Sequence, residues 1–533
     1  MKRLFVTTSI GAVGLFTLLL VPLQGCTDLT ETPISAITPA NFFHTEREAL
    51  AALAGVYAQL RNTSGEGDYW GISEVSTDEM VVPTRGSDWF DNGTWLETHR
   101  QTWGANSPST LSFMNNAWNT AYAGIARANV LLEALQQPIL PDSIKTPIEG
   151  EARFLRAFYY YLLMDVFGGV PIATTTELKA NARATRDSTF RFIESELLAI
   201  RSDLPKQWGD TTALGTKVGR VTRGAVDALL ANMYINARVF KNEAAGSGIS
   251  ATTYNSCAGV TVSGGLDACQ AALNRTDSIL NSGVYALADS FPENFSPDND
   301  ASPENIFVVK FAAAADGLGF NMVMRTLHYN QFNPSPWNGF ATLAQTYSAF
   351  DPADKRRRMF LVGPQVNLEN LQPVKDRAGN PLVFTTSIAD VTQATEGEGA
   401  RIYKWPIDPR HVQQNNGNDF AWFRLGEMYL IKAEAELEGA TGSSTPLALL
   451  KAVRLRAVPQ PDTLSAVTRD VILRERLFEL NSEGKRRQDL IRHGQYTQAW
   501  QFKAGPTADF RILMPIPQTQ IDANALITQN PGY

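Results

Sequence analysis

The stretch Thr146-Pro-Ile-Glu-Gly-Glu-Ala-Arg-Phe-Leu-Arg-Ala-Phe-Tyr-Tyr-Tyr-Leu-Leu-Met-Asp-Val-Phe-Gly-Gly-Val-Pro171 decides the fold of this 533-residue chain. Thr146 and Glu149 have the spacing of a capping box, and Pro147 occupies the first helical position, so we predict that a helix starts here. Gly168-Gly169 permits a left-handed stop, and Pro171 prevents continuation. Apolar residues recur every fourth position in two adjacent rows, which predicts a mostly buried helix. The rows are Phe154, Phe158, Leu162 and Val166, and Leu155, Tyr159, Leu163 and Phe167.

Similar patterns predict helices along most of the chain. Thr45 and Glu48 form a second capping box before an apolar stripe, and inside the central helix Arg153 stands four residues after Glu149, a spacing that predicts an ion pair. Consecutive helix pairs of this size resemble degenerate tetratricopeptide units, although the usual Trp-Leu-Gly-Tyr pattern is missing. Further helices are predicted near 109–136, 188–203, 222–240, 267–282, 423–436, 469–481 and 483–492, and strands at 306–311 and 400–405.

The predicted fold class is mainly α, with a scaffold of degenerate tetratricopeptide-like helical pairs, an irregular loop-rich subdomain and a few short strands. Composition changes along the chain suggest the boundaries of its parts. We expect a lipoprotein signal peptide at 1–25, a tether and lead-in at 26–45, a helical scaffold at 46–241 with a binding loop at 62–108, the irregular subdomain at 242–420, and a carboxyl-terminal helical region at 421–533.

The amino terminus has the pattern of a bacterial lipobox. Lys2 and Arg3 precede an apolar run from Leu4 to Val21, and Leu-Gln-Gly-Cys26 follows. Only cysteine supplies the thiol that accepts diacylglycerol, and several acyl chains anchor a protein stably, so we predict lipidation at Cys26. The alternatives are a plain signal peptide or a single membrane span.

Two cysteines remain after Cys26 is assigned. Cys257 and Cys269 are separated by a segment rich in Gly, Val, Thr and Ser. Export to an oxidising compartment favours a disulfide between them, and the alternative is two free thiols in a loop.

A row of three glutamates marks the carboxyl-terminal helices. Bare like charges four residues apart repel by ~0.2–0.5 kcal/mol per pair, so nearby arginines are expected to neutralise the row. We interpret the pattern as a structural ion-pair lattice, with a ligand site as the alternative. The glutamates are Glu475, Glu479 and Glu483, and the arginines are Arg474, Arg476, Arg486 and Arg487.

Charge and aromatic content narrow the classes of ligand. The net charge is -7 and no basic face is evident, which argues against a nucleic-acid partner. Aromatic residues make up 10% of the chain and include 10 Trp, so some are expected at a binding surface. Residues 62–108 show no helical period and alternate Trp, Asp, Asn, Arg and Gly, which is typical of a functional loop.

Sugars present apolar C–H faces to Trp and Tyr, and their hydroxyl groups bind Asp, Asn and Arg. The loop supplies this mixture, and two aromatic residues of the irregular subdomain would complete a platform. For each tryptophan, packing in the core is the alternative. The predicted ligand-binding residues are Asp78, Arg85, Trp89, Asn92, Trp95, Tyr329 and Trp337.

Signatures of catalysis and metal binding are missing from the sequence. The His residues have no zinc spacing, and Asp298-Asn-Asp300 lacks the glycine and distal glutamate of a calcium loop. We therefore expect no cofactor and no metal, while calcium binding by loop carbonyls stays open. Asp78 and Glu79 are the only carboxyl pair that we consider for glycosidase chemistry, and a structural role is the alternative.

Several blocks resemble the SusD/RagB family. These are Glu-Ala-Arg-Phe-Leu-Arg-Ala-Phe-Tyr-Tyr and Phe-Gly-Gly-Val-Pro around the central helix, the Arg220-Val-Thr-Arg-Gly-Ala-Val-Asp block, Glu483-Gly-Lys-Arg-Arg-Gln-Asp-Leu, and the ending Gln529-Asn-Pro-Gly-Tyr533. The chain departs from the family pattern at Arg487-Gln488, where aromatics are common, and at Gln520, where Glu is frequent.

The resemblance implies a non-enzymatic lipoprotein of the outer membrane, facing the cell exterior. Such a protein captures a glycan or oligosaccharide and passes it to a SusC-like TonB-dependent transporter. Three alternatives remain open: a peptide-capturing RagB-like lipoprotein, a lipid-anchored glycoside hydrolase, and a helical scaffold with no small ligand.

Overall fold

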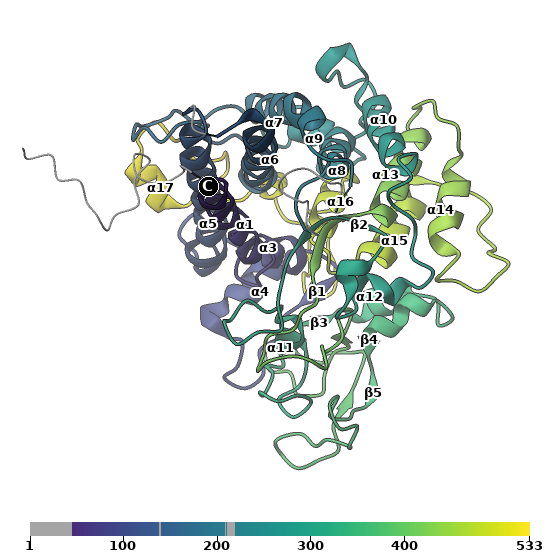
Figure 1. Ribbon diagram of the computed structural model, residues 1–533. Helices are drawn as coiled ribbons and strands as arrows, with labels where there is room; N and C mark the ends of the chain where they lie inside the picture. The colour runs from purple at the N-terminus through teal and green to yellow at the C-terminus, as the bar shows by residue number, and fades with distance from the viewer. Residues whose placement is uncertain (1–44, 138–139, 208, 210–218) are drawn as a thin grey trace, which may run out of the picture. The chain divides into compact units, whose positions relative to one another are not determined.

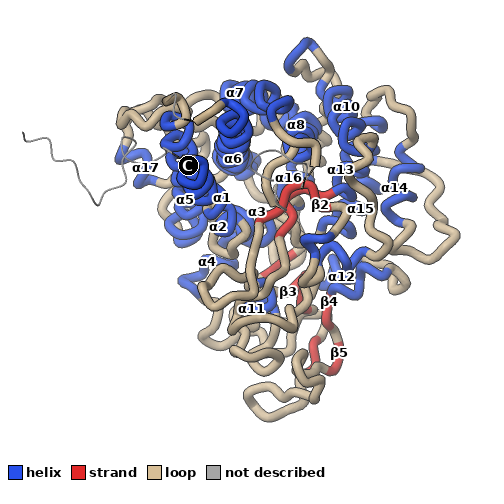
Figure 2. The backbone as a smooth tube through the Cα atoms, in the orientation of Figure 1, coloured by secondary structure: helices blue, strands red, loops and turns tan. Residues whose placement is uncertain are grey.

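Helices dominate the computed structural model, which describes residues 45–137, 140–207, 209 and 219–533 (Figures 1 and 2). The predictions for the signal peptide, for Cys26 and for the tether up to residue 44 lie outside these residues. The helices are α1 Glu46–Ala58, α2 Leu60–Thr63, α3 Tyr69–Val75, α4 Thr94–Arg100, α5 Asn115–Ala134, α6 Asp142–Phe167, α7 Arg186–Ile200, α8 Arg223–Ile235, α9 Ala237–Phe240, α10 Ala268–Leu280, α11 Met322–Thr326, α12 Ala344–Ala349, α13 Leu425–Leu437, α14 Pro446–Arg454, α15 Arg469–Leu480, α16 Arg486–Arg492 and α17 Gln518–Ala523.

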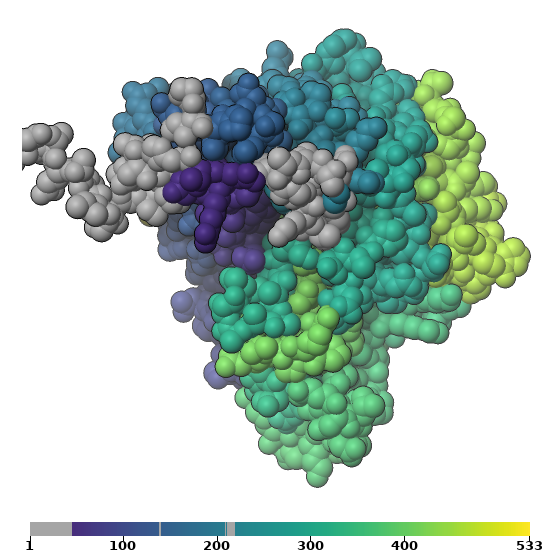
Figure 3. Space-filling view, viewed as in Figure 1, coloured from purple at the N-terminus to yellow at the C-terminus, as the bar shows by residue number. Residues whose placement is uncertain are grey.

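The long helices pack on one another in a row. α1 and α6 both pack on α5, and the row continues through α7, α8, α10 and α13 to α14 and α15. α14 lies at the yellow-green edge of the space-filling view (Figure 3). The contact of α10 with α13 joins segments that are far apart in the sequence. This arrangement confirms the prediction of a mainly α fold built from helical pairs, and the described residues from Thr45 to Tyr533 form one compact unit.

The central helix α6 ends where the sequence predicts and begins earlier. Gly168 caps it with φ 78°, a backbone conformation that favours glycine. The prediction that Thr146 starts the helix is wrong, because Asp142 already lies in the first helical turn and Pro147 is inside the helix. An acidic residue in the first turn is stabilised by the helix dipole, which favours this earlier start.

The predicted ion pair between Arg153 and Glu149 is also wrong. Arg153 and Arg156 both bind Glu196 of α7, at 2.9 and 2.6 Å. Glu196 lies largely buried between the two helices and accepts hydrogen bonds from both arginines. A contact between neighbouring helices therefore replaces the predicted contact along one helix.

Short antiparallel strand pairs lie outside the helical row. β2 pairs with β8 around Phe307 and Phe423, which confirms the strand predicted at 306–311. The helix predicted from residue 423 is shorter, because β8 extends to Arg424 and α13 starts at Leu425. The strands are β1 Met80–Val81, β2 Asn305–Val309, β3 Ala341–Thr342, β4 Phe360–Leu361, β5 Gly363–Pro364, β6 Val383–Phe384, β7 Arg401–Ile402 and β8 Phe420–Arg424.

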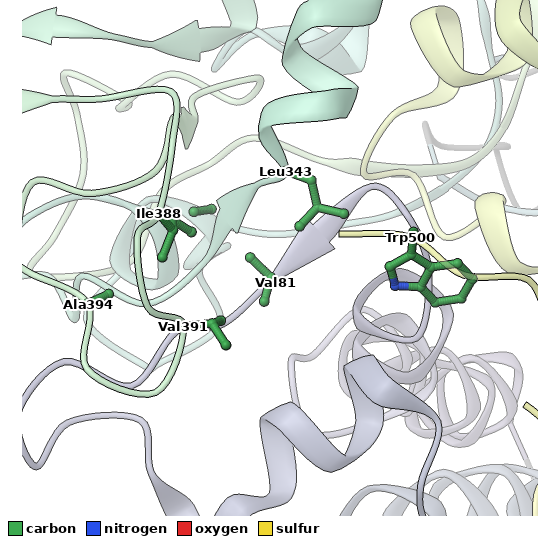
Figure 4. Close-up of a cluster of buried hydrophobic side chains, with 7 residues drawn as sticks. Val81, Leu343, Ile388, Val391, Ala394 and Trp500 are labelled. Atoms are coloured by element: carbon green, nitrogen blue, oxygen red, sulfur yellow. The ribbon is translucent and has the colours of Figure 1, made fainter. Parts of the chain in front are cut away.

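A buried apolar cluster attaches the loop-rich region to the remainder of the chain. Figure 4 shows side chains from β1, from the end of β3, from the loop after β6 and from the carboxyl-terminal region pointing toward one another. Apolar burial of this kind stabilises a loop that has little regular hydrogen bonding. The cluster contains Val81, Ala341, Leu343, Ile388, Val391, Ala394 and Trp500.

Residues 62–108 contain more regular structure than predicted. They include α3, β1 and α4, so the prediction of a long irregular loop is wrong. Every residue of α3 is buried, and a helix buried on all sides shows no amphipathic stripe in its sequence. Its amino terminus is capped by Asp68, whose carboxylate accepts a hydrogen bond from the Tyr69 N–H.

The predicted ion-pair lattice exists, but its partners differ from those expected. Glu479 binds Arg356, Arg424 and Arg456, which lie in other segments of the chain. The arginines nearby in sequence bind elsewhere: Arg486 binds Asp78, and Arg487 binds Asp165. Glu475 binds Arg356 and Arg454, and Glu483 binds Arg424 and Lys404.

Arg424 is the centre of this lattice. Its guanidinium contacts Glu479 and Glu483 at 2.7 Å and Glu304 at 3.2 Å, and all four side chains are at most 2% exposed. Burial opposes ionisation of Glu483, but the charges of Arg424 and Lys404 outweigh it and lower its pKa. Each charge is therefore compensated inside the protein.

Cys257 and Cys269 form a disulfide that joins the loop before α10 to its first turn.

We predict that Arg424→Met destabilises the protein by about 3–5 kcal/mol, because it leaves Glu304, Glu479 and Glu483 buried with fewer partners. Chemical denaturation measures the loss. The matched control is Arg191→Met, whose exposed pair with Asp187 is worth at most about 0.5 kcal/mol. Equal effects of the two substitutions would contradict the structural role of the lattice.

Candidate functional site

Two half-buried tryptophans from distant segments meet at the protein surface. The Trp89 Nε1–H donates a hydrogen bond of 2.6 Å to the carbonyl oxygen of Trp337, and the two ring centroids are 6.5 Å apart. Phe90, beside Trp89, is 57% exposed. The structure therefore brings together two of the predicted ligand-binding residues and adds an exposed ring that sequence reasoning missed.

Backbone geometry fixes the position of both indole rings. Trp89 has φ 63° and is followed by a turn in which Asp91, Asn92 and Gly93 also have positive φ. Gly339 allows Trp89 to pack, because a Cβ on this glycine would lie 2.4 Å from the indole ring. On the other side, the Trp337 N–H donates to the Met324 carbonyl of α11.

Trp95 is a buried residue that packs against Trp89. The prediction that its ring is exposed for ligand stacking is wrong. Its side chain is only 4% exposed. It packs against Trp89, Phe113 and Phe340 with centroid distances of 4.7–5.3 Å. Its Nε1–H donates to the Asp91 carboxylate at 2.6 Å, which connects it to the turn after Trp89.

Two of the predicted polar contacts are occupied by protein partners. Both carboxylate oxygens of Asp78 accept hydrogen bonds from Arg486 at 2.7 Å. Arg85 is 2% exposed and donates to the carbonyl oxygens of Asn338, Thr395 and Glu398, and burial lowers its pKa to about 10. Burial makes the predicted ligand contact of Arg85 wrong in this structure. Asp78 keeps a side-chain exposure of 20% beside Arg486, so its ligand contact stays a prediction.

The carboxyl pair considered for catalysis is not presented to a ligand. Glu79 is 2% exposed and accepts a hydrogen bond from the Ser482 N–H. Burial and the nearby Glu74 carboxyl raise the pKa of Glu79. With Asp78 bound to Arg486, the two carboxyl groups do not form an open acid/base pair.

Tyr329 lies at the rim of the tryptophan pair and is covered on one face. Its hydroxyl donates to Asp88, and the Arg377 guanidinium lies 4.1 Å from the ring centroid. Burial and the Asp88 carboxylate raise the pKa of Tyr329 to about 12. Asn92 is exposed on the turn between Trp89 and Trp95.

Charges at this rim compensate one another. Arg377 binds Asp88 and Glu396, and His328 Nε2 lies 2.8 Å from Glu396. Burial opposes ionisation of Glu396, but hydrogen bonds from Arg377 and His328 lower its pKa to about 2. Sequence reasoning missed Asp88 and Arg377. The position of Asp88 directly before Trp89 could have indicated that it lies at the site. No pattern in the sequence around Arg377 indicates this.

The arrangement combines exposed aromatic faces with compensated polar groups. Trp89, Trp337 and Phe90 offer apolar surface, while Asn92, Asp88 and Arg377 surround it with donors and acceptors. Indole rings of this kind stack on apolar faces, with orientation set by hydrogen bonds at the edge. Among the described residues, no cluster of His, Cys, Asp and Glu is suited to hold a metal ion.

Two family models match different parts of the chain. The model described as SusD family matches residues 329–533, and the model described as "Starch-binding associating with outer membrane" matches residues 52–235. The chain belongs to the SusD-like family. Trp89 lies in the part matched by the second model, and Tyr329 and Trp337 lie in the part matched by the first.

Relatives of known name agree with this assignment over most of the chain. "SusD-like protein P2" from Formosa agariphila is 22% identical over 97% of this chain and 99% of its own length. "Starch-binding protein SusD" from Bacteroides thetaiotaomicron is 25% identical over 72% of each chain. Surface glycan-binding protein A from Bacteroides thetaiotaomicron, solved in complex with laminarihexaose, has the same fold with a TM-score of 0.68, 20% identity, and coverage of 91% of this chain and 99% of its own.

Within the part of this SusD-like chain that the structure describes, no helix has the length and apolar character needed to cross a bilayer.

Proposed function

We propose that this SusD-like protein binds a glycan at the outer face of the outer membrane, does not cleave it, and passes it to a SusC-like TonB-dependent transporter. The observation that carries the proposal is the half-buried pair of Trp89 and Trp337 at the surface, fixed by a hydrogen bond and by backbone contacts. A rigid aromatic surface binds sugar rings without losing conformational freedom on binding.

The comparisons support a glycan over a peptide. One relative is named for starch, and a solved structure of the same fold carries laminarihexaose. The enclosed carboxylate of Glu79 and the paired carboxylate of Asp78 support binding without hydrolysis.

We predict that Trp337→Ala and Trp89→Ala each weaken glycan binding at least about tenfold, a loss of ~1.4 kcal/mol. The reason is that each substitution removes a stacking surface. Delivery to a transporter requires reversible capture, so we expect a wild-type dissociation constant between ~1 μM and ~1 mM. An array of glycans and peptides identifies the ligand, and isothermal titration calorimetry measures the affinities.

The matched control is Phe192→Ala, which removes a half-buried ring from α7 and should leave binding unchanged. Trp95→Ala should instead lower stability by about 3–5 kcal/mol, as expected for a core aromatic residue. Selective binding of peptides would contradict the proposal. Normal glycan binding by folded Trp89→Ala and Trp337→Ala proteins would also contradict it.

We also propose that Cys26 carries the lipid anchor. We predict that Cys26→Ser releases the protein from the membrane fraction, since a hydroxyl group at this position does not replace the thiol that accepts diacylglycerol. Metabolic labelling with a fatty acid, followed by fractionation, measures the change. A variant that stays in the membrane and keeps its label would refute this assignment.

The proposed transporter is a separate protein, because a binding protein of this kind supplies no route across the membrane. We predict that a SusC-like protein is recovered with the tagged chain from outer membranes dissolved in mild detergent. Mass spectrometry identifies the partner. Recovery of the chain alone, from membranes shown to contain a SusC-like protein, would count against the complex.

A further inference from the structure

A polar cavity of about 500 Å³ lies between α2, α5 and the segment that leads into α11, three elements that Figure 2 labels. Its volume falls within the range of roughly 300–1,000 Å³ that is usual for ligand sites. It is separate from the Trp89–Trp337 surface, and none of the predicted ligand-binding residues lines it. The residues used in the argument below are Arg61, Glu66, Asp68, Asn116, Asn119 and Arg325.

Arg325 connects this cavity to the tryptophan pair. Its guanidinium lines the cavity, pairs with Glu66 at 2.8 Å and lies 5.0 Å from the ring of Trp70. Its carbonyl oxygen accepts hydrogen bonds from the N–H groups of Gly339 and Phe340, two and three positions after Trp337. α11 therefore binds the segment that carries Trp337 through its main chain, and it lines the cavity with the Arg325 side chain.

The cavity wall offers both donors and acceptors to a ligand. Arg61 donates from Nε to the Lys310 carbonyl, and its two Nη groups have no partner among the described residues. Asn116 donates to the Gly67 carbonyl, while the amide oxygen of Asn119 accepts a long contact of 3.3 Å from the Gln520 amide. Asn116 and Asn119 are exposed and lie three positions apart on α5, so they share one face of the helix.

Both carboxyl groups of the cavity wall have partners within the protein. Glu66 pairs with Arg325, and Asp68 is buried, with its carboxyl oxygens accepting hydrogen bonds from Thr120 and the Tyr69 N–H. Burial raises the pKa of Asp68 to about 7, so it carries less than a full negative charge near neutral pH. A ligand with many hydroxyl groups matches this mixture of donors and acceptors, because each hydroxyl both donates and accepts.

We propose that this cavity is a second saccharide-binding site, which takes a short saccharide through Arg61, Asn116 and Asn119. The proposal rests on the proposed function, since it assigns the cavity to the same class of ligand. A second contact would let the protein hold a longer glycan at two points, and α11 would keep the two points at a fixed spacing.

The test compares a cavity variant with a platform variant. The cavity variant is Asn116→Ala with Asn119→Ala, two exposed substitutions that suit a helix. Its control is Asn115→Ala, on the same helix but outside the cavity wall. The probes are laminarihexaose, maltohexaose, xylohexaose, mannohexaose and galactohexaose, each titrated by calorimetry and by saturation-transfer difference NMR.

We expect the cavity variant to weaken binding of the tightest probe at least about threefold, the loss of roughly one hydrogen bond. The Trp337→Ala protein should still bind the probe weakly in the NMR experiment. Combining Trp337→Ala with the two cavity substitutions should abolish this remaining binding. A cavity variant that binds like the wild type in both backgrounds would overturn the second site.

The same experiment separates the two proposals. If Trp337→Ala abolishes saccharide binding and the cavity variant binds like the wild type, the Trp89–Trp337 surface is supported as the binding site and the second site is overturned. If the cavity variant loses saccharide binding and Trp337→Ala binds like the wild type, the cavity is supported as the binding site and the Trp89–Trp337 surface is overturned. If none of the probes binds the wild-type protein, the Trp89–Trp337 surface and the cavity are both overturned as sites for neutral hexasaccharides.

Discussion

Arg424 contacts carboxylates from separate segments of the chain, and the need to compensate these buried charges constrains the fold. Glu304 directly precedes β2, Arg424 ends β8, and Glu479 lies in α15. A buried ion pair adds little net stability over an apolar contact, but a buried charge without its partner is strongly unfavourable. The lattice therefore favours one arrangement of these segments over other compact arrangements.

This constraint bears on the binding surface through the loop-rich region. The β2–β8 pair and the apolar cluster around Val81 attach that region to the helical row. Within it, α11 fixes Trp337 by a main-chain hydrogen bond, and Arg85 fixes the neighbouring loops by binding their carbonyl oxygens. The tryptophan pair is thus formed by loops but supported by buried polar contacts, which is how a surface built from irregular segments becomes rigid.

Local patterns predicted much of the fold. The two apolar rows and Gly168 identified the buried part of α6, and the capping box at Thr45 gave the start of α1. The charge row at Glu479 indicated an ion-pair lattice, although its partners were missed because they come from distant segments. Spacing describes contacts within one element and contains little information about contacts between elements.

The candidate site was predicted only in part, for the same reason. Trp89 and Trp95 lie in one short stretch with similar neighbours, yet Trp89 is half-buried at the surface and Trp95 is in the core. The difference depends on positive φ angles in the turn between them and on Phe113 and Phe340 beneath Trp95. Arg377 reaches Tyr329 from another loop, a contact that no local pattern indicates.

The central claim is that glycan covers the rings of Trp89 and Trp337. Hydroxyl-radical footprinting, read by mass spectrometry with and without a bound glycan, tests it most directly. The account predicts that oxidation of Trp89 and Trp337 falls on binding, while buried Trp70 and Trp95 react slowly in both states. Unchanged oxidation of Trp89 and Trp337 at saturating glycan would contradict it.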